Sequence, residues 1–250
     1  MPYTVNVQRT VHAAPGVVWA ALADPALVSQ WFGDVDRIVP GEPFRCEMGD
    51  GDYFAGATVA ADPGRELRLR WRFMDIGPSF DIRYTIEPAR DGAVVVSVAD
   101  TGAPIAAEAD SLREGWTDFL SRLDRFVTTG VRTRFAWSPS IAMGALAAGT
   151  VEESRARLGD AWLREHLAGT AAKASSRGAP MTIEISDPRW GGAATTVTLA
   201  FHPLEAQTYI ALAHEGWPAL PAALQLAERR RYARIWQAAL AAVETVTLST

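Results

Sequence analysis

The chain has 250 residues, of which 48% are hydrophobic and 21% are charged, and its formal net charge is −5. This composition is typical of a globular protein with a substantial core. The acidic balance argues against a nucleic-acid partner, because phosphate binding needs a surplus of cations on one face. Cys46 is the single cysteine, so neither a disulfide nor a thiolate metal site can form within one chain.

Targeting and cofactor signals give only negative expectations. There is no apolar run of about eighteen residues, so we expect no membrane span. The first residues lack the basic and then apolar pattern of a secretory signal, and we expect a cytoplasmic protein. The four histidines show no metal-binding spacing, and no nucleotide-binding or nucleophile-elbow motif is present. We therefore predict no metal, no cofactor and no catalytic residue.

The first half of the chain reads as a strand, two short helices and then a meander. Alternating apolar residues predict a strand over 3–11, and Asp24-Pro25 separates short helices at 14–22 and 26–32. Clusters of Gly, Pro and Asp then separate strand-length runs, which predicts antiparallel hairpins. These turn clusters lie at 49–52, 62–64, 76–78 and 88–92.

The strands of this meander have one apolar face, and a long helix follows them. Between 67 and 73, apolar residues alternate with three arginines, and 82–86 and 94–98 alternate similarly. From 105 to 127 the apolar residues recur at three- and four-residue steps, which predicts a helix that covers the sheet. Its stripe consists of Leu112, Trp116, Phe119, Leu120, Leu123, Phe126 and Val127.

The second half repeats the first faintly. Residues 141–160 align without gaps on 5–24, and a second long helix is predicted over 222–246. Between them 180–187, 197–203 and 210–218 correspond in order to 43–50, 82–88 and 96–104. The second copy has far fewer residues between its segments 180–187 and 197–203 than the first has between 43–50 and 82–88. This difference predicts a second sheet that lacks two strands. We predict domains at 1–128 and 131–250, packed against one another.

Several phrases of the first half resemble a known family. They lie at 11–25, 31–33, 40–44, 56–59, 69–71 and 115–116. Together they resemble the START-like, helix-grip proteins of the SRPBCC superfamily, in the branch named after the activator of heat-shock-protein ATPase homologues. The resemblance implies an α+β fold, START/Bet v-like, in which a curved antiparallel sheet wraps a long C-terminal helix. It also implies a cavity between sheet and helix, here in two unequal copies, of which the second is degenerate.

The aromatic residues on the facing surfaces are the candidate site. Any single one is expected to fill the core, but as a set within this fold some should line an apolar pocket. The predicted ligand-binding residues are Trp71, Phe73, Tyr84, Trp116 and Leu120. Gly115 would fit a close approach or cavity space, since glycine weakens a helix by roughly 1 kcal/mol relative to alanine. Only the first domain is expected to hold a sizeable pocket.

Three functions follow as hypotheses. The first is a non-catalytic protein that binds a small hydrophobic molecule. The second is an enzyme of the polyketide cyclase or hydratase type, which would need two polar groups, among residues such as Glu47, Arg83 and Tyr84, to converge in the cavity. The third, a co-chaperone-like interaction module, rests on the family name. His214, at the position matched by Asp100, is predicted to be a turn residue that caps the second long helix.

Overall fold

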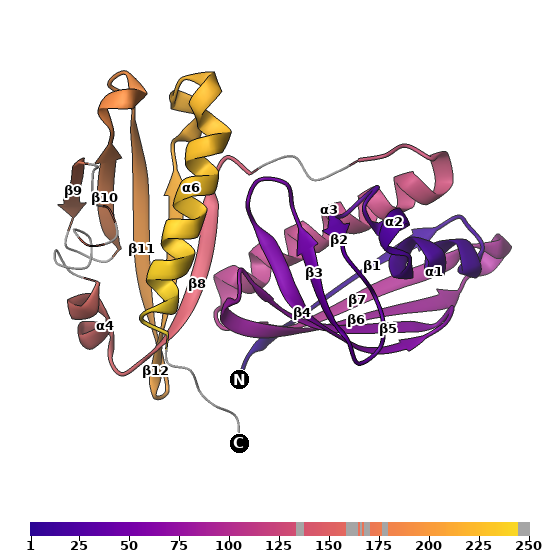
Figure 1. Cartoon of the computed structure of the whole chain (residues 1–250). Helices are drawn as coiled ribbons and strands as arrows, with labels where there is room; N and C mark the ends of the chain where they lie inside the picture. The colour runs from indigo at the N-terminus through magenta and orange to yellow at the C-terminus, as the bar shows by residue number, and fades with distance from the viewer. Residues whose placement is uncertain (134–137, 159–164, 166, 168–170, 177–179, 245–250) are drawn as a thin grey trace. The chain divides into compact units, whose positions relative to one another are not determined.

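The computed structural model describes residues 1–133, 138–158, 165, 167, 171–176 and 180–244. The chain divides into two compact units, Met1–Met74 with Pro78–Ala136, and Asp75–Gly77 with Trp137–Thr250. Each unit has its own antiparallel sheet and its own long helix (Figure 1). Among the helices of the described residues, none is both long and apolar enough to cross a membrane.

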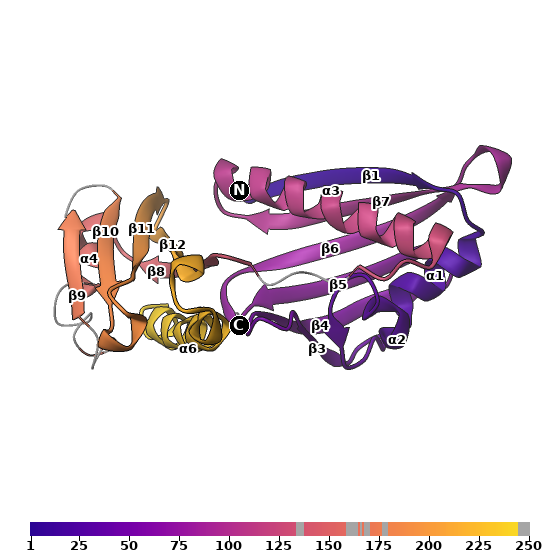
Figure 2. The same cartoon turned by 90° about the horizontal axis from the view of Figure 1, so that it is seen from above.

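The first unit is a curved sheet of seven strands in the order β1-β7-β6-β5-β4-β3-β2, with α3 (Ala106–Thr129) across one face (Figure 2). Two short helices, α1 (Pro15–Ala23) and α2 (Pro25–Val28), connect the first two strands. The strands are β1 (Tyr3–Val11), β2 (Asp34–Val35), β3 (Pro43–Glu47), β4 (Tyr53–Asp62), β5 (Glu66–Phe73), β6 (Ile76–Pro88) and β7 (Val94–Ala103). The predicted helix-grip fold is confirmed.

One predicted turn is displaced. The sequence favoured 76–78, but the turn between β5 and β6 lies at Met74 and Asp75, whose φ angles are 52° and 60°. A two-residue hairpin turn of type I′, whose twist matches that of its strands, needs positive φ at both positions. Here Met74 and Asp75 adopt positive φ although neither is glycine. The nearby Gly77 and Pro78 therefore gave the wrong position for the turn.

Helix α3 contacts the first sheet along its length. Trp116, Leu120 and Leu123 are buried on the face toward the sheet, as the periodicity predicted. Arg9 of β1 donates to Asp124 (2.8 Å) and Ser121 (3.0 Å), which fixes the helix against the first strand. The helix ends at Gly130, whose φ of 71° is the left-handed conformation that favours glycine.

The second unit has the same order of elements with fewer strands. Its sheet runs β8-β12-β11-β10-β9 in the described residues, and α6 (Ala222–Ala241) packs over one face (Figures 1 and 2). The strands are β8 (Ile141–Ala148), β9 (Ala171–Ser176), β10 (Met181–Ser186), β11 (Ala194–Leu204) and β12 (Gln207–Glu215). The short helix α4 (Val151–Arg157) follows β8 as α1 follows β1.

The two strand orders correspond one to one, except that the second sheet has no counterparts of β4 and β5 in the described residues. The chain therefore contains two unequal copies of one fold. The ends of two predicted segments, 159–160 and 245–246, lie outside the described residues. The boundary at 128 and 131 stays a prediction: α3 continues to Thr129, and the Thr133 N–H donates to the carbonyl of Gln30 (3.1 Å).

Candidate functional site

Three of the predicted site residues meet between α3 and the first sheet. Trp71 lies on β5, Tyr84 on β6 and Trp116 on α3, and all three side chains are buried. The ring centroids of Trp71 and Trp116 are 6.0 Å apart at an interplanar angle of 12°, and Tyr84 meets Trp116 edge-on at 5.7 Å. Alternation on each strand and helical periodicity on α3 bring these rings to one interior.

Phe32, at the end of the segment after α2, completes this group of rings. Its ring lies nearly parallel to those of Trp116 (6.3 Å, 6°) and Trp71 (6.1 Å, 17°), and it contacts Phe119 at 4.5 Å. We call Phe32, Trp71 and Trp116 the parallel rings. The sequence placed Phe32 at the end of a predicted helix over 26–32 and not in the site. In the structure that helix ends at Val28, so helical periodicity does not give the direction of the Phe32 ring.

The other two predicted residues are less central. Phe73 is half-buried at the end of β5 and contacts Phe54 of β4 edge-on at 5.4 Å. Leu120 is buried on α3, one turn after Trp116. Leu120 belongs to the core cluster between α3 and the sheet, whereas Phe73 does not. Of the five predicted residues, Trp71 and Tyr84 line the cavity described next.

The cavity beside the parallel rings is small. Its volume is about 20 Å³, which is room for about one water molecule, whereas ligand pockets usually measure about 300 Å³ or more. Among the described residues, the structure therefore has this small cavity between α3 and the sheet in place of the sizeable pocket that was expected, because aromatic side chains fill the space. The lining residues are Leu22, Val28, Trp31, Phe32, Val35, Ile38, Phe44, Cys46, Leu67, Leu69, Trp71 and Tyr84.

Asp100, on β7, is a buried carboxylate within this apolar interior. Its side chain is 1% exposed, and Oδ2 accepts a hydrogen bond of 2.7 Å from the Trp116 indole N–H. Oδ1 is buried and has no hydrogen-bond partner in the described residues. Burial raises the pKa of Asp100 from 3.8 to about 6, opposed by the Trp116 hydrogen bond and reinforced by the charge of Asp81.

The position of Asp100 could have been inferred from the sequence. The alternation that turns Val96 and Val98 inward also turns Asp100 inward, two residues further along the strand. The prediction of a turn at His214, the residue matched to Asp100, concealed that pattern. Strand β7 in fact continues to Ala103, so Asp100 lies within it.

Tyr84 is the only one of the three named polar candidates to reach this interior. Burial raises the pKa of the Tyr84 hydroxyl well above 10, and the nearby Asp100 adds to the effect. Arg83 lies exposed and pairs with Glu66, and Glu47 pairs with Arg45 near the surface. The polar groups that gather in the interior are thus Tyr84 and Asp100.

Two wider hollows lie on the outer face of the same sheet. Their volumes are about 480 and 560 Å³, and both include Arg83, Thr85 and Glu87 of β6. These side chains alternate with the buried Ile82, Tyr84 and Ile86, so they point away from α3. The mixed charges of this face do not suit an apolar ligand.

In the second unit, His214 occupies the place of Asp100, within the last strand of the sheet. The prediction that it caps α6 is wrong: His214 is completely buried in β12, and α6 begins without a side-chain cap. Its Nδ1 accepts from the Trp236 indole N–H (2.8 Å), and its Nε2 lies 2.8 Å from Thr195 Oγ1. Burial lowers the pKa of His214 from 6.5 to about 3.

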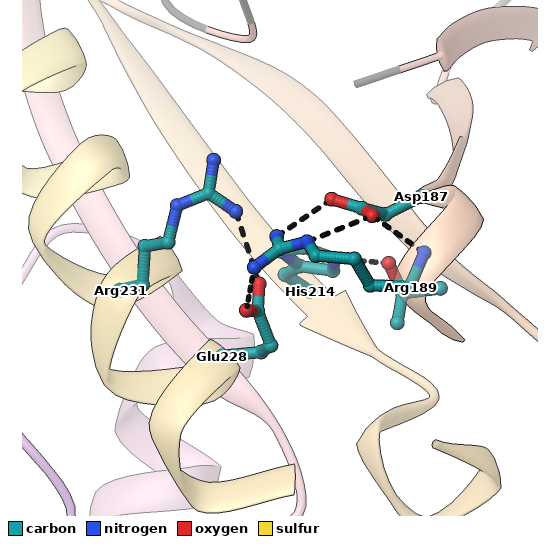
Figure 3. Close-up of polar contacts among 6 residues, drawn as sticks. Asp187, Arg189, His214, Glu228 and Arg231 are labelled. Atoms are coloured by element: carbon teal, nitrogen blue, oxygen red, sulfur yellow. Dashed lines mark hydrogen bonds and ion pairs between the residues drawn. The ribbon is translucent and has the colours of Figure 1, made fainter. Parts of the chain in front are cut away.

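A chain of ion pairs lies near His214, between α6 and the segment after β10 (Figure 3). Arg189 contacts Asp187 (2.6 Å) and Glu228 (3.2 Å), and Glu228 also pairs with Arg231 (3.0 Å). Hydrogen bonds from Arg189 lower the pKa of Asp187. These contacts stabilise charged groups, and no group of three or more potential metal ligands is found among the described residues.

Comparison with known proteins agrees with this architecture. Residues 12–128 match the family described as "Activator of Hsp90 ATPase homolog 1-like protein". Among solved structures, DynU16, from the dynemicin biosynthetic locus, is 26% identical, with a TM-score of 0.82 over 96% of this chain and 97% of its own. No curated protein matches.

Other solved structures match about half of the chain. CV1439 from Chromobacterium violaceum is 24% identical over 50% of this chain and 98% of its own, with a TM-score of 0.45. MLL2253 from Mesorhizobium loti is 21% identical over 50% and 96%, with a TM-score of 0.47.

The fold and the interior between sheet and helix define a helix-grip protein with two copies. Its first copy, over residues 12–128, matches the activator-of-Hsp90-ATPase-homologue-like branch of the SRPBCC superfamily.

Proposed function

We propose that the first unit binds a small, planar, apolar molecule between α3 and the sheet, without transforming it. The observation that carries the proposal is the group of parallel rings, Phe32, Trp71 and Trp116, together with a mainly apolar cavity that Phe32, Trp71 and Tyr84 help to line. Flat aromatic faces favour a flat apolar ligand through stacking and burial of apolar area. The likeness to DynU16, from a biosynthetic locus, supports a small-molecule role.

Because the cavity is so small, binding requires the rings to move apart. The parallel orientation of the three rings means that a planar molecule can lie parallel to each of them after a modest displacement. In this proposal the free protein is mainly closed, and the ligand stabilises an open conformation by its greater affinity for it.

Cys46 provides a direct measure of this opening. It is the chain's single cysteine, it is completely buried, and it lines the cavity. We expect Cys46 to react slowly with 5,5′-dithiobis(2-nitrobenzoate) in the free protein. The same reaction should be slower still when the bicyclic probe indole or benzothiophene is present. Isothermal titration should give a dissociation constant for at least one probe. If neither probe, at up to its solubility limit, binds or protects Cys46, the proposal fails.

A matched pair of substitutions locates the binding. Trp71→Leu removes a flat face from the first interior, and Trp236→Leu makes the same chemical change in the second unit, whose tryptophan is equally buried. Trp71→Leu should weaken probe binding at least severalfold, whereas Trp236→Leu should leave it unchanged. An equal loss in both variants would contradict a site in the first unit.

A second candidate is a polyketide cyclase or hydratase-type enzyme. The observation in its favour is the placement of two buried polar groups on neighbouring strands: Asp100 of β7 pairs with Ile82 of β6, two residues from Tyr84. A carboxyl group with a pKa of about 6 can exchange a proton near neutral pH. Turnover of a cyclisable poly-β-ketone that is lost in Asp100→Asn would favour this function over simple binding. The co-chaperone hypothesis rests on the family description alone, and we do not pursue it.

A further inference from the structure

We propose that the ligand of the first unit carries an O–H or N–H group that donates a hydrogen bond to Oδ1 of Asp100. This inference rests on the proposed function and specifies the ligand class: a planar, mainly apolar molecule with at least one hydrogen-bond donor on its edge.

The first observation is the unequal use of the two carboxylate oxygens. Oδ2 accepts the Trp116 indole N–H at 2.7 Å, while Oδ1 is buried without a partner in the described residues. A buried acceptor that has lost water and gained no donor is costly, and most buried polar atoms in proteins are paired. Asp100 does not line the small cavity, so in this proposal Oδ1 accepts from the ligand once the rings have moved apart.

The second observation is the position of Asp100 beside the parallel rings. The indole of Trp116 both donates to Asp100 and lies nearly parallel to Trp71 and Phe32. A planar ligand that stacks beside these rings is therefore held close to the carboxylate. The ring system supplies affinity for a flat apolar body, and the carboxylate supplies selectivity for a donor.

The second unit shows that an unpaired acceptor is not inherent in this fold. His214 lies at the equivalent place in the last strand, and both its ring nitrogens have partners, Trp236 and Thr195. In the second unit the buried polar side chain, His214, is fully paired within the protein, whereas in the first unit Oδ1 of Asp100 has no hydrogen-bond partner in the described residues. We therefore assign donor recognition to the first unit alone.

Indole and benzothiophene test the inference because they are planar bicycles of similar size, and only indole has an N–H. Isothermal titration of the full chain at pH 7.5 should show indole binding about tenfold more tightly, as expected for a hydrogen bond to a charged acceptor. In Asp100→Asn, the amide oxygen can still accept from Trp116, so the fold is kept and the open acceptor is lost. The affinity ratio should then fall close to one.

Asp81→Asn is the matched control, because Asp81 is an exposed carboxylate on neighbouring β6, paired with Arg70. It should keep the wild-type ratio. Equal binding of both probes by the wild type, a preference for indole that survives in Asp100→Asn, or the same loss of preference in Asp81→Asn would overturn the inference while the proposed function stands. Binding of neither probe would overturn both.

Discussion

Asp100 couples the electrostatics of the first unit to its stability. A carboxylate buried among apolar rings is stabilised by one hydrogen bond, from Trp116, and destabilised by the loss of water. Desolvation is the larger effect, so the folded state favours the protonated form. Its contribution to stability is therefore fully present below the unfolded pKa of 3.8 and is lost as the pH rises through about 6.

Replacing Asp100 by Asn should remove this pH dependence. Since the pKa rises from 3.8 to about 6 on folding, the wild type should lose about 2 kcal/mol relative to the variant between pH 4 and pH 7. Chemical denaturation at a series of pH values measures this difference. The exposed Asp81→Asn variant retains Asp100 and should therefore keep the pH dependence of the wild type. A wild-type curve parallel to that of Asp100→Asn would contradict the prediction.

At the scale of elements, the sequence predicted the long helix and the alternating strands well. Periodicity decides which residues face the core, and it correctly directed Trp71, Tyr84 and Trp116 inward. It could not predict the turn at Met74 and Asp75, where two residues adopt positive φ without glycine. It also could not predict the volume left between facing side chains, since that depends on how Phe32 and its neighbours pack.

Gly115 in the middle of α3 illustrates the same limit. The sequence suggested a close approach or free space, and an added Cβ would meet no atom within 4 Å. Close packing therefore does not require this glycine. Gly115→Ala should stabilise the first unit by about 0.5–1 kcal/mol, because alanine has the higher helix propensity. Thermal denaturation of the variant measures the gain.

Gly56 of β4 supplies the opposite case. A Cβ at this position would overlap the carbonyl oxygen of Arg70 and the backbone of Trp71 on the neighbouring strand. Gly56→Ala should therefore destabilise the first unit by about 1–3 kcal/mol through overpacking. If Gly115→Ala were destabilising to a similar extent, the open space beside the helix would be disproved.

At the scale of the whole molecule, each unit contains the elements of a separate core. A fragment of residues 1–133 should fold and unfold cooperatively, because it retains all seven strands, α3 and the Thr133 to Gln30 hydrogen bond. A fragment of 1–128 lacks Thr129 and the Gly130 cap, and should be less stable by about 1 kcal/mol. Circular dichroism with urea compares the two. Failure of the longer fragment to unfold cooperatively would show that the first unit depends on the second.

The two copies also place different titratable groups at the equivalent buried position, which gives them opposite responses to acid. As the pH falls through 6, protonation of Asp100 stabilises the first unit. His214, whose pKa is lowered from 6.5 to about 3, stabilises the second unit fully above 6.5. Below 6.5 that stability falls by about 1.4 kcal/mol per pH unit until about pH 3.

Lowering the pH from 7.5 to 5 should therefore separate the unfolding of the two units. Calorimetry should show two transitions that move apart, and hydrogen exchange should assign the earlier opening to peptides from β11, β12 and α6. His214→Gln removes the titrating group, so the second unit of this variant should lose less stability on acidification even if its packing is weaker at pH 7.5. A parallel shift of both units, or an unchanged acid response in His214→Gln, would contradict the assignment. Asp100 and His214 each accept a tryptophan N–H from the helix that covers their sheet. If the two transitions separate as expected, the same kind of buried contact gives opposite pH responses in the two units.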